Sequence, residues 1–584
     1  MGAFFLSPIK FQIPSCVREV FKKQGFHEPL EFEFANYRVL LFKKQLIDYF
    51  QAVNINESTL LAIGTCFYKN REVRDGLNLF LNDFINHSLD LSAVVGSFLI
   101  LIWHENRLFF LSDKSGVQNI YFNDHFKIAS SSFLSTITAL SGLSGKLKLN
   151  REALTEILIT GNLIGPETLV EEITRFEPLL HKDLFEIERI SANKEISVSN
   201  LPTTFNEAID EQVQTLSNYF KQISENINSL GSISGLTGGF DSRLLFLFIR
   251  EKSSHCRLYC TSRENMTDEH ICARKFAEAA NKILYSQEHK KLTKLEPEYV
   301  AEFISDSFFF NDGIIRTNQI WLEEIKSRKY LIKLYGKEKL GFSGVGGEQY
   351  RNSDYLIKNT YNLYSWVKYE LIYRNCGNVF SKSRLRDQTI SRISGKIRLL
   401  LNIGDQRKTI SKKEIKRYYN ECWNPANRTV RNNIENQLLF FLSPFTEHGV
   451  SQFAYRAIPF LGHYHKFEKD MIYKLSPELS GVKTNYGYSP NQSGLAKFRA
   501  IPVLKGILGL RIYNFIYFNH RKKNQSGNEE VLKTHKSLSK YLEIIEKLGL
   551  PVSVNELCKN DLLAPLIIEA GYFLHKMGKD IMYD

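Results

Sequence analysis

One short segment of the chain combines glycines, hydroxyls and a carboxylate in an order that suits phosphate chemistry. Residues 235–243 read Gly-Leu-Thr-Gly-Gly-Phe-Asp-Ser-Arg, after an expected strand and at the start of an expected helix. Gly238 and Gly239 let the backbone turn tightly and approach a ligand without a Cβ in the way. Free N–H groups at the start of the helix attract anions, and Thr237 and Ser242 can add hydroxyl donors. The segment therefore predicts a phosphate site.

Asp241 places a carboxylate inside this predicted anion site. Such a group is expected there when a divalent cation lies between it and the phosphates, because Mg²⁺ is commonly held by one or two carboxylates together with phosphate oxygens. The structural alternative is a plain glycine turn that Asp241 caps. The complete string from Thr237 to Ser242, between a strand and a helix, is more specific than a glycine pair alone. We therefore expect a phosphate site that also holds a metal.

The elements that would position this loop change character along the chain. Up to about residue 200 the sequence is β-rich, and from Phe205 to Leu230 the apolar spacing is helical. Short strands and helices then alternate, which favours a parallel sheet with covering helices and hence the α/β class. The chain beyond Tyr350 is expected to be mostly helical. The expected strands are Tyr37–Phe42, Leu60–Phe67, Val94–Trp103, Arg107–Ser112, Asn119–Phe122, Lys127–Ser131, Ser232–Leu236, Arg257–Thr261 and Ile283–Ser286, and further helices are expected at Val73–Ile85, Arg151–Thr160, Arg243–Glu251 and Asp268–Asn281.

The composition is that of a globular protein and narrows the range of partners only slightly. The 584 residues include 76 Lys and Arg and 63 Asp and Glu, a net charge of +13. This excess suits an anionic substrate, a nucleic acid or a membrane surface without selecting one. The longest apolar run, Leu91–Trp103, is too short to span a bilayer, so no membrane insertion is expected. The first residues do not form a secretory signal, and the scattered cysteines suit reduced thiols, so we expect a cytoplasmic protein.

The Thr237–Ser242 string resembles the pyrophosphate-binding loop of the ATP pyrophosphatases, whose usual form is Ser-Gly-Gly-x-Asp-Ser. Further blocks resemble those of the class B asparagine synthetase superfamily and occur in the same order. In the N-terminal half these blocks are Val95–Trp103, Ser112–Gly116 with Ile120–Phe122, Ala129–Ser131 and Gly161–Glu172. In the C-terminal half they are Thr261–Ala277, Asp312–Arg316, Ser343–Gln349, Pro444–Glu447 and Lys483–Gly487.

The resemblance implies two domains. Residues 1–200 would form a glutaminase-like αββα sandwich of the Ntn-hydrolase-like kind. Residues 201–584 would form an asparagine synthetase-like, ATP-binding domain with a Rossmann-like (adenine nucleotide alpha hydrolase-like) parallel sheet and a helical extension. A working glutaminase of this type uses Cys as residue 2, whereas this chain begins Met1-Gly2-Ala3 and its first cysteine is Cys16. The N-terminal domain is therefore expected to lack glutaminase activity.

The resemblance also implies a reaction, the ATP-dependent and AMP-forming synthesis of an amide bond. A small-molecule or peptide carboxylate would be adenylated with release of pyrophosphate and then transferred to ammonia or an amine. Asp241 and Glu348 would hold Mg²⁺, and Lys483 and Asp241 are the expected catalytic residues, with Lys483 neutralising charge at the α-phosphate. The residues expected to bind ATP and pyrophosphate are Leu236, Thr237, Gly238, Gly239, Phe240, Asp241, Ser242, Ser343 and Gly344.

Two departures from the family pattern leave alternatives open. Glu348 stands where the family has a second metal-binding Asp, and Val345 replaces an acidic residue that serves as base in some members. The chain could therefore be a catalytically silent relative that binds nucleotide or a partner protein. If it is a ligase, ammonia could come from a separate glutaminase, and a homo-oligomer is compatible with the sequence.

The remaining cations have more than one interpretation. The basic stretch Ser381–Arg417 allows nucleic-acid binding, but its cations recur at helical spacing with apolar residues. We expect a solvated helix face there and no nucleic-acid partner. Arg243 and Arg316 are candidates for phosphate or acidic-substrate contacts, and equally for ion pairs or solvated positions.

Overall fold

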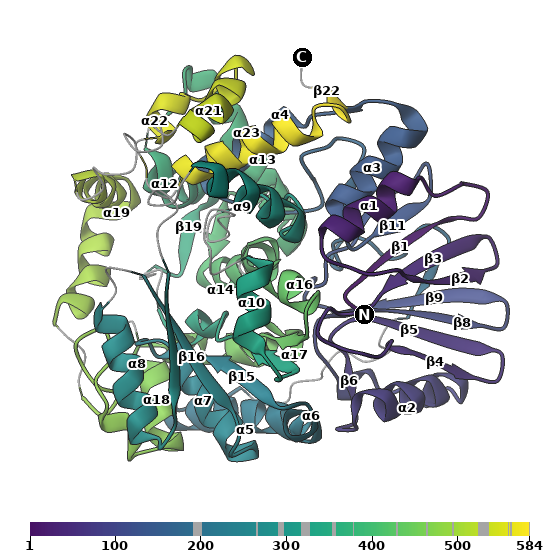
Figure 1. Cartoon of the computed structure of the whole chain (residues 1–584). Coiled ribbons are helices and arrows are strands. Elements are labelled where there is room, and N and C mark those ends of the chain that lie inside the picture. Colours follow the sequence, from purple (N-terminus) through teal and green to yellow (C-terminus); the bar gives the residue numbers. More distant parts are fainter. Residues whose placement is uncertain are drawn as a thin grey trace.

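The chain folds into a β-rich N-terminal part and a C-terminal part built on a parallel sheet (Figure 1). The computed structural model describes residues 1–190, 201–263, 267–289, 297–316, 327–352, 358–377, 379–427, 430–462, 465–492, 496–523, 536–558, 560 and 563–582. The mixed α/β class expected from the sequence is confirmed. The division expected at residue 200 falls at the end of residues 191–200, which lie outside the described residues.

Two mainly antiparallel sheets form the N-terminal part. The first has the strand order β13-β10-β11-β1-β3-β2 and the second the order β14-β9-β8-β5-β4. The strands of the first sheet are β1 (Ala3–Pro8), β2 (Leu30–Phe34), β3 (Tyr37–Phe42), β10 (Tyr121–Asn123), β11 (Ile128–Ser130) and β13 (Thr174–Arg175). Those of the second are β4 (Ala52–Ile55), β5 (Ser58–Gly64), β8 (Phe98–His104), β9 (Arg107–Ser112) and β14 (Glu188–Arg189).

The two sheets pack face to face between helices, in four layers. Phe4, Leu41, Leu101 and Phe110 lie in the apolar core between the sheets. The outer face of the first sheet packs on α1 (Ser15–Lys23) and α3 (Phe133–Ser144), and that of the second on α2 (Val73–Ile85). Because both faces are covered, β1 and most of β8 are buried at every position, which explains why their sequences are continuous apolar runs without alternation.

A five-stranded parallel sheet forms the centre of the C-terminal part, in the order β17-β16-β15-β18-β21. Helices α5 (Phe205–Lys221) and α7 (Asp241–Lys252) cover one face, and α10 (Arg328–Tyr335) and α16 (Val430–Asn436) cover the other. The chain starts at β15, adds β16 and β17 on one side and then β18 and β21 on the other. Ligands of such sheets bind at the carboxyl ends of the strands where this reversal occurs. The strands are β15 (Ser232–Gly235), β16 (Arg257–Arg263), β17 (Leu284–His289), β18 (Leu340–Phe342) and β21 (Phe440–Leu442).

Several local predictions are confirmed at their bounds. The strands Tyr37–Phe42 and Arg107–Ser112 and the helices Val73–Ile85 and Arg151–Thr160 are present as expected. The single helical stretch expected over Phe205–Leu230 is instead two helices, α5 and α6 (Ser224–Leu230), since Gln222 and Ile223 lie between them.

The chain beyond Tyr350 is mostly helical, as expected. No helix of the described residues combines the length and the apolar character needed to cross a membrane. The C-terminal strand β22 (Ile581–Met582) pairs with β12 (Leu147–Lys148), so the chain end returns to the N-terminal part. The other long helices are α8 (Thr267–Ala279), α9 (Pro297–Phe310), α13 (Ser383–Leu401), α18 (Lys466–Leu475), α19 (Ala496–Lys523), α21 (Lys536–Lys547) and α23 (Ala564–Met577).

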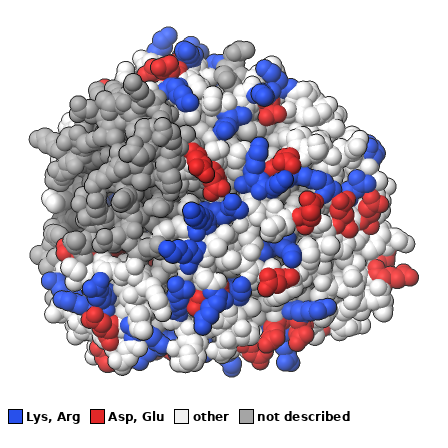
Figure 2. All heavy atoms as spheres, in the orientation of Figure 1, with Lys and Arg blue, Asp and Glu red and all other residues white. Residues whose placement is uncertain are grey.

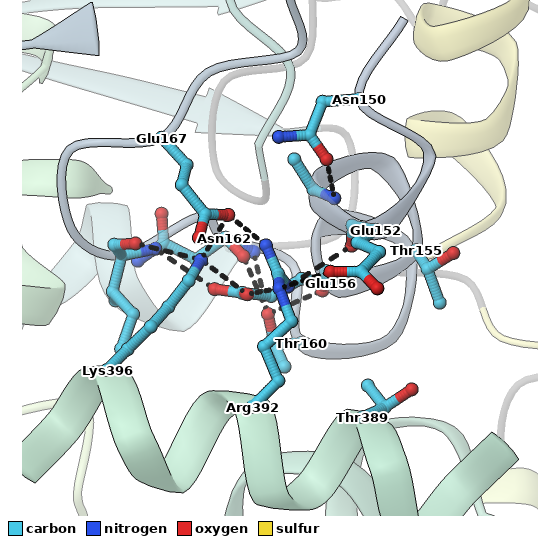
Figure 3. A network of polar contacts seen from close by, with 12 residues as sticks. Asn150, Glu152, Thr155, Glu156, Thr160, Asn162, Glu167, Thr389, Arg392 and Lys396 are labelled. Atoms are coloured by element: carbon cyan, nitrogen blue, oxygen red, sulfur yellow. Dashed lines mark hydrogen bonds and ion pairs between the residues drawn. The ribbon is translucent and has the colours of Figure 1, made fainter. Parts of the chain in front are cut away.

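A buried network of ion pairs joins α4 (Arg151–Thr160) and the loop after it to α13 (Figure 3). Arg392 of α13 lies 2.9 Å from Glu152 and 2.8 Å from Glu156 and also pairs with Glu167. Lys396 lies one turn further along, 2.8 Å from Glu156 and 2.9 Å from Glu167. The solvated helix face expected for this basic stretch is therefore wrong at Arg392 and Lys396, because both cations point at carboxylates of α4 and its loop.

Most other cations of the basic stretch 381–417 that have described partners are also neutralised within the chain. Arg407 pairs with Glu414, and Arg417 with Glu421. On the face shown in Figure 2, Lys and Arg side chains are interspersed with Asp and Glu and form no continuous patch of one sign. These pairs neutralise part of the positive charge of the stretch.

We expect Glu156→Gln to lower the free energy of unfolding by about 2 kcal/mol, because it leaves Arg392 and Lys396 half-buried with fewer counter-charges. The Glu156 side chain is only 2% exposed. Glu152→Gln is a matched control, since Glu152 contacts the same Arg392 but is 78% exposed, and a solvated pair contributes less than about 0.5 kcal/mol. The thermal unfolding midpoints of both variants measure the difference, and equal shifts would contradict the assignment.

Glu447 is a second buried carboxylate between the two parts of the chain. The N–H of Gly96 donates to Glu447 Oε2 at 3.0 Å, and the Tyr219 hydroxyl donates to Oε1. Burial raises the pKa of the Glu447 carboxyl to about 7. The folded state therefore holds this proton more tightly than the unfolded state does, so its contribution to stability falls as pH rises from about 4.5 through 7 and is constant above that.

We expect thermal stability to decline between about pH 5 and pH 8, and to decline less in Glu447→Gln. Part of the decline remains in the variant, because burial also raises the pKa of Asp312 to about 7 and that of Asp113 to about 6. Unfolding midpoints measured across this pH range for both proteins give the comparison. Parallel curves for the two would show that Glu447 does not titrate in this range.

Candidate functional site

A cavity of about 460 Å³ lies at the carboxyl ends of β15 and β18, where the strand order reverses. It brings together the loop after β15, the loop after β18 and side chains from helices on the α16 face of the sheet. The residues that line it are Gly235, Leu236, Thr237, Asp241, Ser242, Tyr259, Cys260, Thr261, Asn311, Arg316, Leu331, Phe342, Ser343, Gly344, Val345, Glu348, Arg431, Ile434 and Glu435. A volume of this size suits a small-molecule ligand.

The loop after β15 is held in place by its own hydroxyls. The N–H of Thr237 donates to Ser242 Oγ at 2.9 Å, and the N–H of Gly239 donates to Thr237 Oγ1 at 3.3 Å. The two hydroxyl oxygens are 2.9 Å apart. A Cβ on Gly238 would lie 3.0 Å from Asn485 and 3.1 Å from Glu269. Gly238 is therefore required by close packing, and α7 begins directly after the loop, at Asp241.

Phe240 faces away from the cavity and packs on a remote segment. It is completely buried, and its ring stacks on that of Tyr486 with the centroids 5.6 Å apart. The N–H of Asn485 also donates to the carbonyl of Gly238 at 3.1 Å. The segment around Lys483 is thus fastened to the loop. The Lys483 side chain itself is exposed and is not among the residues that line the cavity.

Arg243 contacts the backbone of the same segment. Its guanidinium is buried and donates to the carbonyls of Val482 at 2.7 Å and Lys483 at 2.8 Å. Among the described residues Arg243 makes no ion pair, and its hydrogen bonds go to backbone carbonyls. It positions the backbone of the segment that carries Lys483.

Asp241, the first residue of α7, and Glu468 of α18 both contact the guanidinium of Arg351. Arg351 Nη2 lies 3.1 Å from Asp241 Oδ2, and Arg351 Nη1 lies 3.7 Å from Glu468 Oε2. Glu468 is fully buried. Burial, with the nearby charge of Asp241, raises the pKa of the Glu468 carboxyl well above its usual range. On its other side Asp241 approaches Gly347 so closely that a Cβ there would lie 2.4 Å from Asp241 Oδ1.

Asp241 and Glu348 both line the cavity and offer oxygen ligands of the kind that Mg²⁺ prefers. Asp241 Oδ1 is buried and accepts no hydrogen bond from the described residues. Glu348 Oε2 accepts one from the N–H of Gly346 at 3.2 Å. No group of three His, Cys, Asp or Glu side chains that could hold a metal occurs in the described part of the chain. The two carboxylates thus suit a Mg²⁺ ion that is also held by phosphate oxygens.

Further charged residues, outside the loop, line the same cavity. Arg316 is a candidate for an anion contact from its sequence, whereas Arg431 and Glu435 carry no local signal. Arg316 is buried, and its Nε and Nη1 have no hydrogen-bond partner among the described residues. Burial lowers the pKa of the Arg316 guanidinium to about 9. Arg431 pairs with Glu435 at 2.7 Å, one turn along α16. Such a buried, incompletely bonded guanidinium at a cavity wall favours an anionic ligand.

Comparison of the sequence with protein-family models and with curated proteins gives no match. The function must therefore be inferred from the chemistry of this cavity.

Proposed function

We propose that this chain is an ATP-dependent, AMP-forming ligase that activates a carboxylate and joins it to ammonia or an amine, as its resemblance to the class B asparagine synthetase superfamily implies. The single observation that carries the proposal is the cavity at the reversal point of the parallel sheet. There Thr237, Asp241 and Ser242 of the loop, Ser343–Gly344 and Glu348 line the same cavity as Arg316, whose Nε and Nη1 have no partner within the described part of the chain.

The architecture supports the same proposal. Four layers in residues 1–189 are compatible with an Ntn-hydrolase-like sandwich, and a parallel sheet with helices on both faces is compatible with a Rossmann-like domain. We assign residues 1–200 to a glutaminase-like domain without its nucleophilic cysteine and residues 201–584 to the synthetase domain. All eight cysteines are free thiols, in keeping with a cytoplasmic enzyme.

In the proposed reaction AMP is transferred from ATP to the substrate carboxylate, and pyrophosphate is released. The cavity residues bind the negatively charged oxygens of these groups. The N–H groups at the N-terminus of α7 hold the departing pyrophosphate. Ser343 and Gly344, at the end of β18, lie beside the α-phosphate and AMP. Arg316 donates to an anionic oxygen of the substrate carboxylate or of the α-phosphate, where negative charge is spread over oxygens in the transition state. Lys483 reaches the phosphates only if its exposed side chain turns toward the loop.

Asp241 and Glu348 are the residues that would hold Mg²⁺. When bound, the ion neutralises phosphate charge and so assists departure of pyrophosphate. For Asp241 to serve in this way, its Oδ1 must remain available while Arg351 contacts Oδ2. Arg351 therefore orients the Asp241 carboxylate.

A second candidate function is nucleotide or partner binding without catalysis. The Asp241–Arg351 pair favours it, because an arginine already neutralises the expected metal ligand. Val345 adds no proton acceptor for the amine at the cavity wall. In this case the loop would bind the phosphates of a nucleotide and no bond would be broken.

A screen for substrate-dependent AMP release separates the two functions. The full chain is incubated with ATP and Mg²⁺ and with amino acids, uronic-acid sugars or peptides, with and without ammonium. Pyrophosphate–ATP exchange is measured in parallel. Exchange that requires one class of carboxylate supports the ligase. Nucleotide binding without exchange for any class supports the silent relative, and absence of both contradicts the nucleotide site.

A further inference from the structure

Helix α19 consists of two helical segments that meet at a kink at Gly509, whose φ is 71°, and each segment buries a polar side chain. Its polar residues Lys505 and Asn514 are buried, and both contact Glu370 Oε1, at 2.6 Å and 3.0 Å. Glu370 lies in the helical turn η5 (Val367–Tyr373), against which α19 packs. Figure 1 places α19 at the outer edge of the molecule, on the side opposite the two N-terminal sheets. These buried polar contacts therefore anchor both segments of α19, and large apolar side chains of both segments are left exposed.

The outward face carries a cluster of large apolar side chains, which we name the α19 patch. Its members are Leu504, Ile507, Ile512, Phe515, Ile516 and Tyr517. Ile507 is 75% exposed, and the other five are between 37% and 53% exposed. They are six of the sixteen large apolar side chains that are exposed in the described part of the chain. A concentration of this kind on two consecutive helical segments marks an interaction surface.

The charge of α19 and of its surroundings indicates which kind of partner the α19 patch binds. The 28 residues of α19 include seven Lys and Arg and no Asp or Glu, and of these cations Lys505 is buried against Glu370. Arg511 is exposed beside the patch. A hollow of about 630 Å³ next to it is lined by Lys368, Arg386, Arg511, Tyr369, Tyr373 and Phe515, among others. Cations and aromatic rings around an apolar face match lipid headgroups above acyl chains.

We propose that α19 docks this protein on an anionic phospholipid bilayer. The α19 patch enters the boundary between headgroups and acyl chains, and the cations of the hollow contact lipid phosphates. A helix with this composition lies in the plane of the interface and does not span the bilayer. Nucleic acid would use the cations but would leave the six apolar side chains in water, so a lipid surface accounts for both features. The inference does not depend on the reaction proposed above.

Vesicle flotation with the full-length protein tests this docking. We expect binding to vesicles that contain phosphatidylglycerol, weaker binding to phosphatidylcholine alone, and loss of binding at high salt. Ile507→Asp should lower the partition coefficient by at least about tenfold, because an apolar side chain leaves the membrane boundary and an anion is added. Arg511→Glu should lower it by at least about fivefold on anionic vesicles.

Ile283→Asp is the matched control, since Ile283 is also 75% exposed but lies just before β17, outside α19. This variant should bind vesicles like the unchanged protein. Unchanged thermal unfolding midpoints in the three variants establish that they are folded. The proposal is overturned if no vesicle is bound, or if Ile507→Asp and Ile283→Asp have equal effects. It is also overturned if the patch variants instead abolish self-association of a protein that does not bind vesicles.

Discussion

Asp241→Asn should reduce substrate-dependent AMP formation by about 10²–10³-fold, the size of effect seen when one preorganised charge contact to a transition state is removed. The side chain keeps its shape, but the carboxylate that would hold Mg²⁺ beside the phosphates is lost. The stability of the variant should change little, because loss of the pair with Arg351 is offset by relief of the repulsion between Asp241 and Glu468. Initial rates of AMP release and of pyrophosphate exchange give the measurement.

Two further variants show whether the effect belongs to this carboxylate. Gly347→Ala keeps the charge but puts a Cβ within 2.4 Å of the present position of Asp241 Oδ1, so the carboxylate must move. We expect a loss in the same direction. Asp470→Asn on α18, which removes a carboxylate paired with Lys466, should leave the rate unchanged. Full activity in Asp241→Asn would remove the metal-binding role of this loop.

The part of the site that the sequence could predict is local. The strand, loop and helix around Thr237–Ser242 can be predicted from neighbouring residues alone, because the glycines and hydroxyls indicate the turn directly. Ser343, Gly344 and Glu348 could be placed only through a resemblance, and the structure brings them to the same cavity. Arg351 and Glu468 carry no local signal, because their importance comes from burial beside Asp241, which is distant in sequence from both.

The misses in the fold have a related cause. Strands β18 and β21 have three residues each, too few for a periodic pattern, and they are defined by parallel pairing with distant strands. Arg392 and Lys396 have the spacing of a solvated helix face. Their actual surroundings depend on the carboxylates of α4, more than two hundred residues earlier in the chain. The spacing of residues on a helix determines which side chains share a face. It does not determine which other residues that face contacts.

Arg351→Met should lower the free energy of unfolding by about 3 kcal/mol, the largest stability effect that we expect at this site. Glu468 is fully buried, and Arg351 is the cation that compensates it. Met fills a similar volume without charge, so the variant is left with a buried carboxylate that must either stay charged in an apolar place or take up a proton. Thermal or denaturant unfolding measures the loss.

The loss should depend on pH in one direction. The pKa of Glu468 is already raised by burial, and removal of Arg351 raises it further. A raised folded-state pKa means that the folded form gains stability from protonation, so the deficit of Arg351→Met should be smaller at about pH 5.5 than at about pH 8. Glu468→Gln in the same chain should restore most of the stability at the higher pH and abolish this pH dependence.

Arg107→Met, which breaks the exposed pair with Glu188, should lower the free energy of unfolding by less than about 0.5 kcal/mol at either pH. If Arg351→Met behaves like Arg107→Met, the triad of Asp241, Arg351 and Glu468 is not a buried unit, and the orientation of Asp241 must have another source.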